Sequence, residues 1–204
     1  YPATGAIERR TVVVVDRAGA VQSEIRIGDV GVDRATPDYF PLLVMNTVLG
    51  GSFTSRLNMN LREKHGFTYG VRSGFTMRRR PGPFLVQTAV ANDVTGRAVQ
   101  EALAEVERLR EGGAVEDELS SARDYLGGVL PLQLQTTAQL AARLDDLVVY
   151  DLPLDWFRSY RSGIAAVSAD DVQRVARRYL RPERFAVVVV GAALEVVPPH
   201  EQLG

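Results

Sequence analysis

The sequence predicts an α+β fold, with a mostly antiparallel sheet and helices packed on one face of it. The order of extended and helical runs supports this prediction, and the length and composition bear on the number of domains. Extended apolar runs come in pairs separated by long helical stretches, whereas a parallel α/β sheet would alternate single strands with helices. The length of 204 residues and the hydrophobic content of 46% suffice for one substantial core. We therefore expect residues 1–204 to form a single domain.

The first pair of strands is predicted near the N-terminus. Residues 11–16 include four consecutive valines, and residues 21–28 follow a turn signal at Ala18-Gly19-Ala20. We expect these two strands to form a hairpin or to be neighbours, with the valine run in the centre of the sheet. The last strand, residues 184–191, also holds four valines and is expected beside the first strand.

Two helices and a second strand pair are predicted next. Residues 38–49 have apolar side chains at helical spacing until Gly50-Gly51 ends the pattern, and a second helix covers residues 54–64. Extended runs over residues 69–77 and 83–91 follow, joined by a Pro-Gly turn.

The C-terminal half is predicted to be mostly helical. Asn92-Asp93 is expected to cap an amphipathic helix over residues 94–111, which Gly112-Gly113 closes. Ser168 and Asp171 form a capping-box pattern at the start of the last long helix. The other helices are expected at residues 115–130, where Pro131 interrupts, and at 136–150, 154–165 and 169–180.

Composition excludes several classes of function. A formal net charge of -1 provides no field that would gather nucleic acid, and no apolar run reaches the roughly 20 residues that span a bilayer. Cysteine is absent, which excludes disulfides, thiolate metal ligands and cysteine nucleophiles. We expect a soluble protein of a bacterial cytoplasm or periplasm. Because the chain does not begin with Met, we also expect it to be a fragment or a processed chain.

The two histidines are not expected to form a zinc site. A catalytic zinc takes three protein ligands, typically two histidines and a carboxylate. His65 stands in Lys-His-Gly and His200 in Pro-His-Glu, and neither has a second histidine or a His-x-x-Glu pattern beside it. We therefore expect no metal and no cofactor in this chain, and we interpret His65 as a turn residue.

Two groups of arginines are expected to be solvated rather than to bind a partner. One is the hairpin tip Arg78-Arg79-Arg80. The other lies in the C-terminal half of the last long helix, where the helix dipole favours cations. Its members are Arg174, Arg177, Arg178 and Arg181.

The segment from residue 50 to residue 70 places an arginine and a tyrosine where they can meet. Arg62 falls near the C-terminal end of the predicted helix, Gly66 allows the chain to reverse, and Tyr69 opens the returning strand. The guanidinium and phenol groups donate hydrogen bonds that suit a peptide carbonyl or an oxyanion formed from it. An Arg and a Tyr at such a junction are also common as a salt bridge and a half-buried aromatic, so geometry alone leaves both interpretations open.

The same segment resembles the C-terminal-type inactive domain of the insulinase-like (pitrilysin, M16) zinc metallopeptidases. The matching residues are Gly50, Gly51, Phe53, Ser55, Arg56, Leu57, Leu61, Arg62, Glu63, Gly66 and Tyr69. The resemblance implies an M16 peptidase or LuxS-like metallohydrolase fold. The order of elements along the whole chain agrees with that domain, although only this segment is specific. The active-half motif His-x-x-Glu-His is missing.

In this family an active half with an inverted zinc motif faces a homologous inactive half, and the two enclose a chamber for peptides. The resemblance implies that this chain is the non-zinc half. Zinc and the general base would then lie on a homologous partner domain, on the same parent chain or on a separate subunit. It also implies that Arg62 and Tyr69 are the catalytic pair that contacts the peptide substrate near the scissile bond. The expected substrate-binding residues are Arg62, Tyr69, Gly50, Gly51, Ser52 and Phe53.

Two other functions stay open. A non-catalytic scaffold or assembly subunit, like the respiratory-complex core proteins that share this fold, would need the interface but not the Arg/Tyr donors. A free-standing peptide-binding module would bind peptide without a partner. The surface made to face a partner half could also let the fragment self-associate. A peptide could also bind by adding a strand to an edge of the sheet, and the sequence does not indicate which edge strand would receive it.

Overall fold

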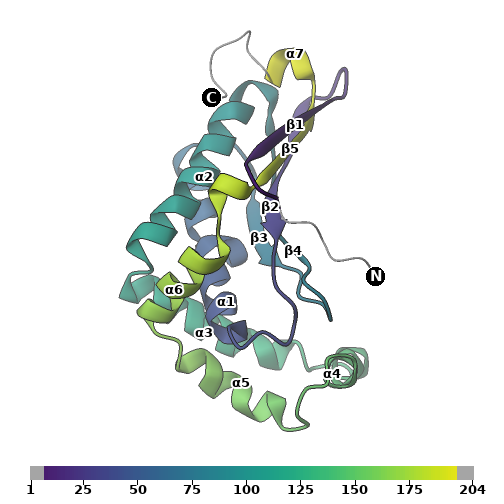
Figure 1. Ribbon diagram of the computed structural model, residues 1–204, viewed down its shortest axis with the longest axis vertical. Coiled ribbons are helices and arrows are strands. Elements are labelled where there is room, and N and C mark those ends of the chain that lie inside the picture. The colour runs from purple at the N-terminus through teal and green to yellow at the C-terminus, as the bar shows by residue number, and fades with distance from the viewer. Residues whose placement is uncertain (1–6, 197–204) are drawn as a thin grey trace.

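A five-stranded sheet flanked by helices forms the body of the computed structural model, which describes residues 7–196 (Figure 1). The strand order is β1-β5-β2-β4-β3. β1 runs parallel to β5, and the other three pairings are antiparallel. The predicted α+β class with a mostly antiparallel sheet is confirmed. The strands are β1 (Thr11–Asp16), β2 (Gln22–Val30), β3 (Val71–Phe75), β4 (Pro83–Ala91) and β5 (Ala186–Gly191).

The valine run of β1 lies at one edge of the sheet, so the expectation of a central strand was wrong. β5 lies between β1 and β2, and the first two strands are therefore neither a hairpin nor neighbours. Val12, Val13 and Val15 are 45%, 43% and 46% exposed. The predicted pairing of the first and last strands is confirmed, with Val13 opposite Val188. A valine-rich run predicts a strand, but its place in the sheet depends on a crossover between distant parts of the chain.

Helices α1, α2, α3 and α6 lie on one side of the sheet, and α4 projects at the lower end of the molecule (Figure 1). α3 continues through Pro131, where an interruption was expected. No helix within residues 7–196 is long and apolar enough to cross a membrane. The helices are α1 (Tyr39–Asn46), α2 (Thr95–Gly112), α3 (Glu116–Leu132), α4 (Thr137–Val149), α5 (Trp156–Ala165), α6 (Ala169–Tyr179) and α7 (Ala193–Val196). The π-helical segments are η1 (Thr47–Gly51) and η2 (Asn58–Lys64), and the 3-10 turns are η3 (Asn92–Val94) and η4 (Pro182–Arg184).

The predicted cap of α6 is confirmed and that of α2 is wrong. At α6 the Asp171 N–H donates to the Ser168 hydroxyl at 3.1 Å, and the Ser168 N–H donates to the Asp171 carboxylate at 3.1 Å. Asn92 instead lies three residues before α2. Its side chain accepts a hydrogen bond from the Ser23 hydroxyl at 2.8 Å and donates to the Ala20 carbonyl at 2.7 Å. A long-range contact therefore takes the side chain that local spacing assigned to a helix end.

The core lies between one face of the sheet and the helices. Alternate side chains of β2 and β4 point into it, and each is at most 1% exposed: Ile25, Ile27, Phe84, Val86 and Val90. This period-2 pattern is the one that a sheet covered on a single face produces. Phe84, Val86 and Val90 of β4 thus share one face.

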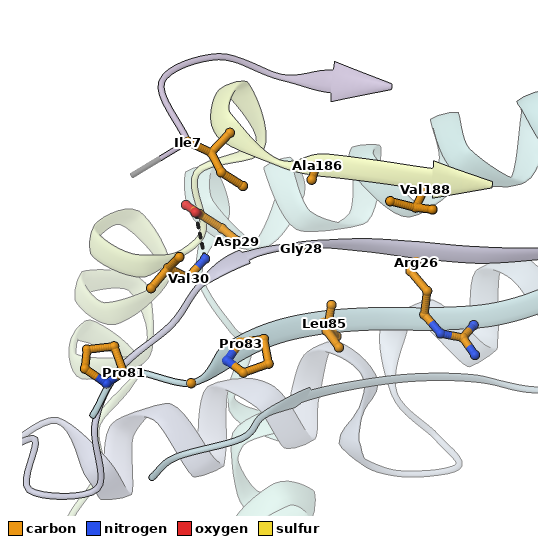
Figure 2. A pocket seen from close by; sticks show the side chains of 11 residues that line it. Ile7, Arg26, Gly28, Asp29, Val30, Pro81, Pro83, Leu85, Ala186 and Val188 are labelled. Atoms are coloured by element: carbon orange, nitrogen blue, oxygen red, sulfur yellow. Dashed lines mark hydrogen bonds between the residues drawn. The ribbon is translucent and has the colours of Figure 1, made fainter. Parts of the chain in front are cut away.

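The opposite face of the sheet carries an apolar hollow of about 300 Å³ (Figure 2). Gly28 contributes only backbone there, because a Cβ would lie 2.1 Å from the Phe84 carbonyl oxygen. Figure 2 shows Ile7 at one side of the hollow and Pro81 and Pro83 at another. The residues that line it are Ile7, Arg26, Gly28, Asp29, Val30, Pro81, Gly82, Pro83, Leu85, Ala186 and Val188.

The buried carboxylate of Asp38 joins the start of α1 to α6. It accepts hydrogen bonds from the Tyr179 hydroxyl at 2.6 Å, from Arg174 at 2.7 Å and from Arg178 at 3.3 Å. Burial raises the pKa of the Asp38 carboxyl, but the hydrogen bonds from Tyr179 and Arg174 and the charges of the two arginines outweigh it. The pKa of Asp38 therefore lies below its usual value.

The other two arginines of this group also have structural partners. Arg181 forms an ion pair with the buried Asp29 at 2.7 Å, and the Nε of Arg177 donates to the Arg110 carbonyl at 3.1 Å. Arg174, Arg177 and Arg178 are exposed as expected, but all four arginines also bond to the protein, and Arg181 is only half-exposed. The tip Arg78-Arg79-Arg80 is exposed as expected, although the Nε of Arg79 donates to the Val149 carbonyl.

The substitution Asp38→Asn is expected to lower the free energy of unfolding at neutral pH by about 1–3 kcal/mol, because Tyr179 and both arginines lose a charged acceptor. A lowered folded-state pKa means that this stabilisation is present above the unfolded-state pKa and is lost as the pH falls through the folded-state pKa. Urea unfolding should therefore show a larger loss of stability between neutral pH and about pH 3 for the wild type than for the variant.

Asp170→Asn is the matched control, since Asp170 is exposed on α6, the helix that carries the partners of Asp38. Its free energy of unfolding should change by less than about 0.5 kcal/mol. If Asp38→Asn and the wild type lose the same amount of stability between neutral pH and about pH 3, the stabilising role of the Asp38 carboxylate is contradicted.

Candidate functional site

The segment from residue 50 to residue 70 lies where β3 forms the second edge of the sheet. It runs from the end of η1 through η2 to the loop that precedes β3. Two surface hollows flank its first turn. Their volumes, about 480 and about 430 Å³, fall within the range of about 300–1,000 Å³ that is typical of small-ligand sites.

We call the first hollow the strand hollow, because it lies between the turn at residues 50–53 and the start of β3. Its lining residues are Gly50, Gly51, Ser52, Phe53, Asn58, Tyr69, Gly70, Val71, Arg72, Ser73 and Tyr125. We call the second the helix hollow, because it lies between the same turn and α3. Its lining residues are Thr47, Val48, Ser52, Phe53, Thr54, Ser55, Asp117, Glu118, Ser121, Ala122 and Tyr125.

Tyr69 stands on a bend two residues before β3, so the expectation that it opens the strand was wrong. The residue is 95% exposed and lines the strand hollow. Its neighbours hold the bend: the Gly70 N–H donates to the Thr68 hydroxyl at 3.1 Å, and the Thr88 hydroxyl of β4 lies 3.0 Å from the Gly70 carbonyl oxygen. An anchored backbone therefore presents a free phenol.

Arg62 packs on the ring of Phe53. Its guanidinium carbon lies 4.3 Å from the ring centroid, and Nη1 donates to the Glu63 carboxylate at 2.7 Å. Arg62 does not line the strand hollow, and no hydrogen bond or cation–π contact joins it to Tyr69 within residues 7–196. The two side chains are linked through Phe53, which stacks with Arg62 and lines the same hollow as Tyr69.

Gly50 must be glycine, because the turn lies against β3. A Cβ at this position would lie 2.6 Å from the Ser73 hydroxyl and 2.8 Å from the Ser73 nitrogen. The same atom would lie 2.8 Å from Leu57. Gly50 therefore allows the turn to pack against the strand, whereas a simple end of a helix would not require it.

Two asparagines occupy the outer edge of β3. Asn58 accepts from the Val71 N–H at 3.1 Å and donates to the Val71 carbonyl at 3.0 Å and to the Ser52 carbonyl at 3.1 Å. Asn46 donates to the Ser73 carbonyl at 3.1 Å and accepts from the Ser73 hydroxyl at 2.8 Å. These side-chain amides bond peptide groups at the edge of β3 that a neighbouring strand would otherwise bond. Asn58 also fixes the turn relative to β3.

The site segment is tied to α3 by a bidentate ion pair. Arg56 Nε and Nη2 donate to the Glu118 carboxylate at 2.7 and 2.6 Å. Burial raises the pKa of Glu118, but the hydrogen bonds from Arg56 and from the Val115 N–H and the charge of Arg56 lower it below its usual value. The pair holds α3, and with it Tyr125, beside the turn.

Zinc ligands do not come together in the part of the chain that the structure describes. No group of three or more His, Asp or Glu side chains in residues 7–196 could hold a metal ion. His65 stacks on Phe67 with ring centroids 4.8 Å apart, and its Nε2 lies 3.9 Å from the Glu101 carboxylate. His200 lies outside the described residues.

Sequence analysis missed Asn58, Asn46 and Tyr125. Asn58 occupies a variable position of the motif and Asn46 precedes the motif, so only their hydrogen bonds to β3 mark them. Tyr125 is 46% exposed on α3, more than fifty residues from the segment that it joins, so no local pattern could bring it there.

Comparison with known families identifies the domain. The model of the peptidase M16 inactive domain matches residues 2–126, which is more than half of the chain. The chain belongs to this family. The absence of the His-x-x-Glu-His motif agrees with an inactive M16 domain.

Three relatives illustrate what this M16 inactive domain resembles. An uncharacterized zinc protease of Streptomyces coelicolor is 29% identical over 196 residues, which cover 90% of this chain and 41% of that protein. The peptidase M16 inactive domain of Pseudomonas fluorescens has a TM-score of 0.85 at 24% identity, with 97% and 48% of the two chains covered. A chain of complex III from Candida albicans has a TM-score of 0.77 at 14% identity, with 92% and 46% covered.

The two structural likenesses show the fold alone. The present chain spans about half the length of these relatives, or slightly less. The M16 inactive domain described above is therefore one part of what the longer relatives contain.

Gly50→Ala is expected to lower the free energy of unfolding by about 1–3 kcal/mol, because the added methyl group would overlap β3. Gly74→Ala is the matched control on β3, since a Cβ there meets no atom within 4 Å. It should leave stability unchanged or raise it by about 0.4–1 kcal/mol. Thermal or urea unfolding measures both, and equal effects of the two variants would contradict the close approach at Gly50.

Asn58→Ala is expected to expose the Val71 N–H to solvent exchange, because its acceptor is removed while β3 stays at the edge. Asn60→Ala is the matched control, because Asn60 is also buried in η2 but donates to Glu101 and Glu105. Both variants should lose global stability, by about 1–3 kcal/mol for each buried group left unpaired. Hydrogen exchange should show selective loss of protection at Val71 only in Asn58→Ala, and equal protection in both would refute the role of Asn58.

Proposed function

We propose that this M16 inactive domain binds a peptide substrate and supplies Tyr69 and Arg62 to an active site whose zinc and general base lie on a homologous partner domain. The observation that carries the proposal is the exposed phenol of Tyr69 on an anchored bend beside a hollow of about 480 Å³. A large aromatic side chain exposed next to a concave surface is typical of a binding site.

The phenol of Tyr69 is suited to donate a hydrogen bond to a substrate carbonyl. Hydrogen bonds on both sides of the bend fix its backbone, so little of that part of the chain needs to reorganise when substrate binds. Donors that are already in place when negative charge develops on a carbonyl oxygen lower the barrier of acyl-transfer reactions.

Arg62 can act beside Tyr69 with the donors that Glu63 leaves free. A guanidinium has five N–H donors, and the hydrogen bond to Glu63 uses Nη1. It stacks on Phe53, and Phe53 lines the strand hollow. We propose that the free N–H groups of Arg62 bind a carbonyl or carboxylate oxygen of the substrate.

The hydrolytic step is assigned to the partner because no group of side chains within residues 7–196 supplies the donor set of a catalytic zinc. Neither histidine belongs to a His-x-x-Glu pattern. The partner domain, covalently joined or separate, and the peptide are thus both parts of the proposal.

The backbone of β3 limits how a peptide can lie in the strand hollow. The Val71 N–H and carbonyl are both bonded to Asn58, so strand addition cannot use them unless Asn58 moves. We therefore assign peptide contact here to side chains, with Tyr69 and Phe53 foremost. Addition of the peptide as a further strand would require an edge whose N–H and carbonyl groups are free.

Tyr69→Phe, in the parent enzyme with the zinc half present, is expected to lower kcat for peptide hydrolysis by on the order of 10²- to 10³-fold, because one transition-state donor is removed. The change in KM should be smaller. Tyr150→Phe is the matched control, because Tyr150 follows α4 and lines neither hollow. Unchanged turnover in Tyr69→Phe would remove Tyr69 from the mechanism.

Metal analysis and a peptidase assay test whether the zinc and the hydrolytic activity require the partner half. The isolated chain is expected to bind no stoichiometric zinc and to hydrolyse no peptide, and activity should appear only when the zinc half is added. Stoichiometric zinc in the isolated chain would contradict the proposal.

A scaffold function is the second candidate, favoured by the likeness to a chain of complex III. Such a subunit needs its interface and not the phenol of Tyr69. In that case Arg62→Ala and Tyr69→Phe should leave assembly intact, and a parent protein without a His-x-x-Glu-His half should show no peptide turnover.

A further inference from the structure

We infer that the helix hollow is a specificity subsite that takes one bulky apolar side chain, aliphatic or aromatic, from the peptide bound at Tyr69. This inference rests on the proposed peptide binding and names the part of the peptide that the domain selects. The side chains that decide it are Phe53 and Tyr125.

The helix hollow adjoins the strand hollow and shares three lining residues with it. Ser52, Phe53 and Tyr125 line both. Phe53 comes from the turn before η2, and Tyr125 comes from α3, so the two rings mark the boundary between the hollows. A peptide that lies along the strand hollow beside Tyr69 therefore has a neighbouring side chain within reach of the helix hollow.

The surfaces that a ligand would meet in the helix hollow are largely apolar. Val48 and Ala122 line it and are only 4% and 3% exposed, so they belong to its deeper part. Phe53 and Tyr125 are 66% and 46% exposed, which leaves much of both rings open to solvent. Removing apolar surface of this kind from water is favourable, at about 25 cal/mol for each Å².

The charges at the rim do not favour a basic side chain strongly. The carboxylate of Glu118 is already held by two hydrogen bonds from Arg56, at 2.7 and 2.6 Å. Asp117 remains, but it is exposed at the start of α3, where water screens its charge. An apolar occupant gains from the floor and both rings, whereas a basic one gains from a single solvated carboxylate.

The test uses the 204-residue chain and a series of blocked peptides, acetyl-Gly-Ser-Gly-Xaa-Gly-Ser-Gly-amide, in which Xaa is Phe, Leu, Ala or Arg. Amide chemical shifts in ¹⁵N-labelled protein report binding and place it on the structure. The Phe and Leu peptides are expected to bind about 10-fold or more tightly than the Ala peptide. They should shift amides at both hollows.

Two serine variants on α3 separate the subsite from a general effect of the helix. Ser121 is exposed and lines the helix hollow, while Ser120 is exposed and lies on a different hollow between α3 and α5. Ser121→Phe should fill the subsite and reduce the affinity for the Phe and Leu peptides to that for the Ala peptide. Ser120→Phe should keep the wild-type preference.

The outcomes distinguish this inference from the proposed function. If the four peptides bind equally and shift amides around Tyr69, peptide binding stands and the subsite is refuted. An Arg peptide that binds as tightly as the Phe peptide would refute the apolar preference and assign the selection to Asp117. If no peptide shifts an amide at residues 68–71, the proposed function itself fails.

Discussion

The outer edge of β3 imposes the constraint on which the candidate site of this molecule depends. An edge strand leaves peptide groups without partners, and they must be satisfied where they are buried. Asn58 bonds both peptide groups of Val71 and also holds the Ser52 carbonyl. The side chain that satisfies the strand therefore also sets the turn against it, and this close packing requires glycine at position 50.

Side-chain hydrogen bonds to β3 thus lie beneath a group of exposed aromatic rings. The amides of the buried Asn58 and the half-buried Asn46 are bonded to β3, while the rings of Phe53, Tyr69 and Tyr125 are exposed to solvent. Such a division suits recognition, because a fixed frame reduces the entropy that binding costs while the exposed rings supply apolar contact area.

Contacts between helices connect the candidate site to the rest of the fold. Asp38 joins α1 to α6 through one hydroxyl and two guanidinium groups, and Arg56 joins the site segment to α3. The sheet is buried by helices on one face only, and its other face carries an apolar hollow. A domain that spans about half the length of its relatives agrees with the proposed two-part enzyme.

Local patterns in the sequence determined the class of the fold, the limits of β4, the cap at Ser168 and the segment that marks the family. Each depends on residues close together in the chain, where periodicity and capping act. Only the tertiary structure decided that β1 is an edge strand, that Asn58 closes β3, and that Tyr125 joins the site. A pattern shows which side of an element is apolar, but the neighbour of that side depends on crossovers and packing between distant segments.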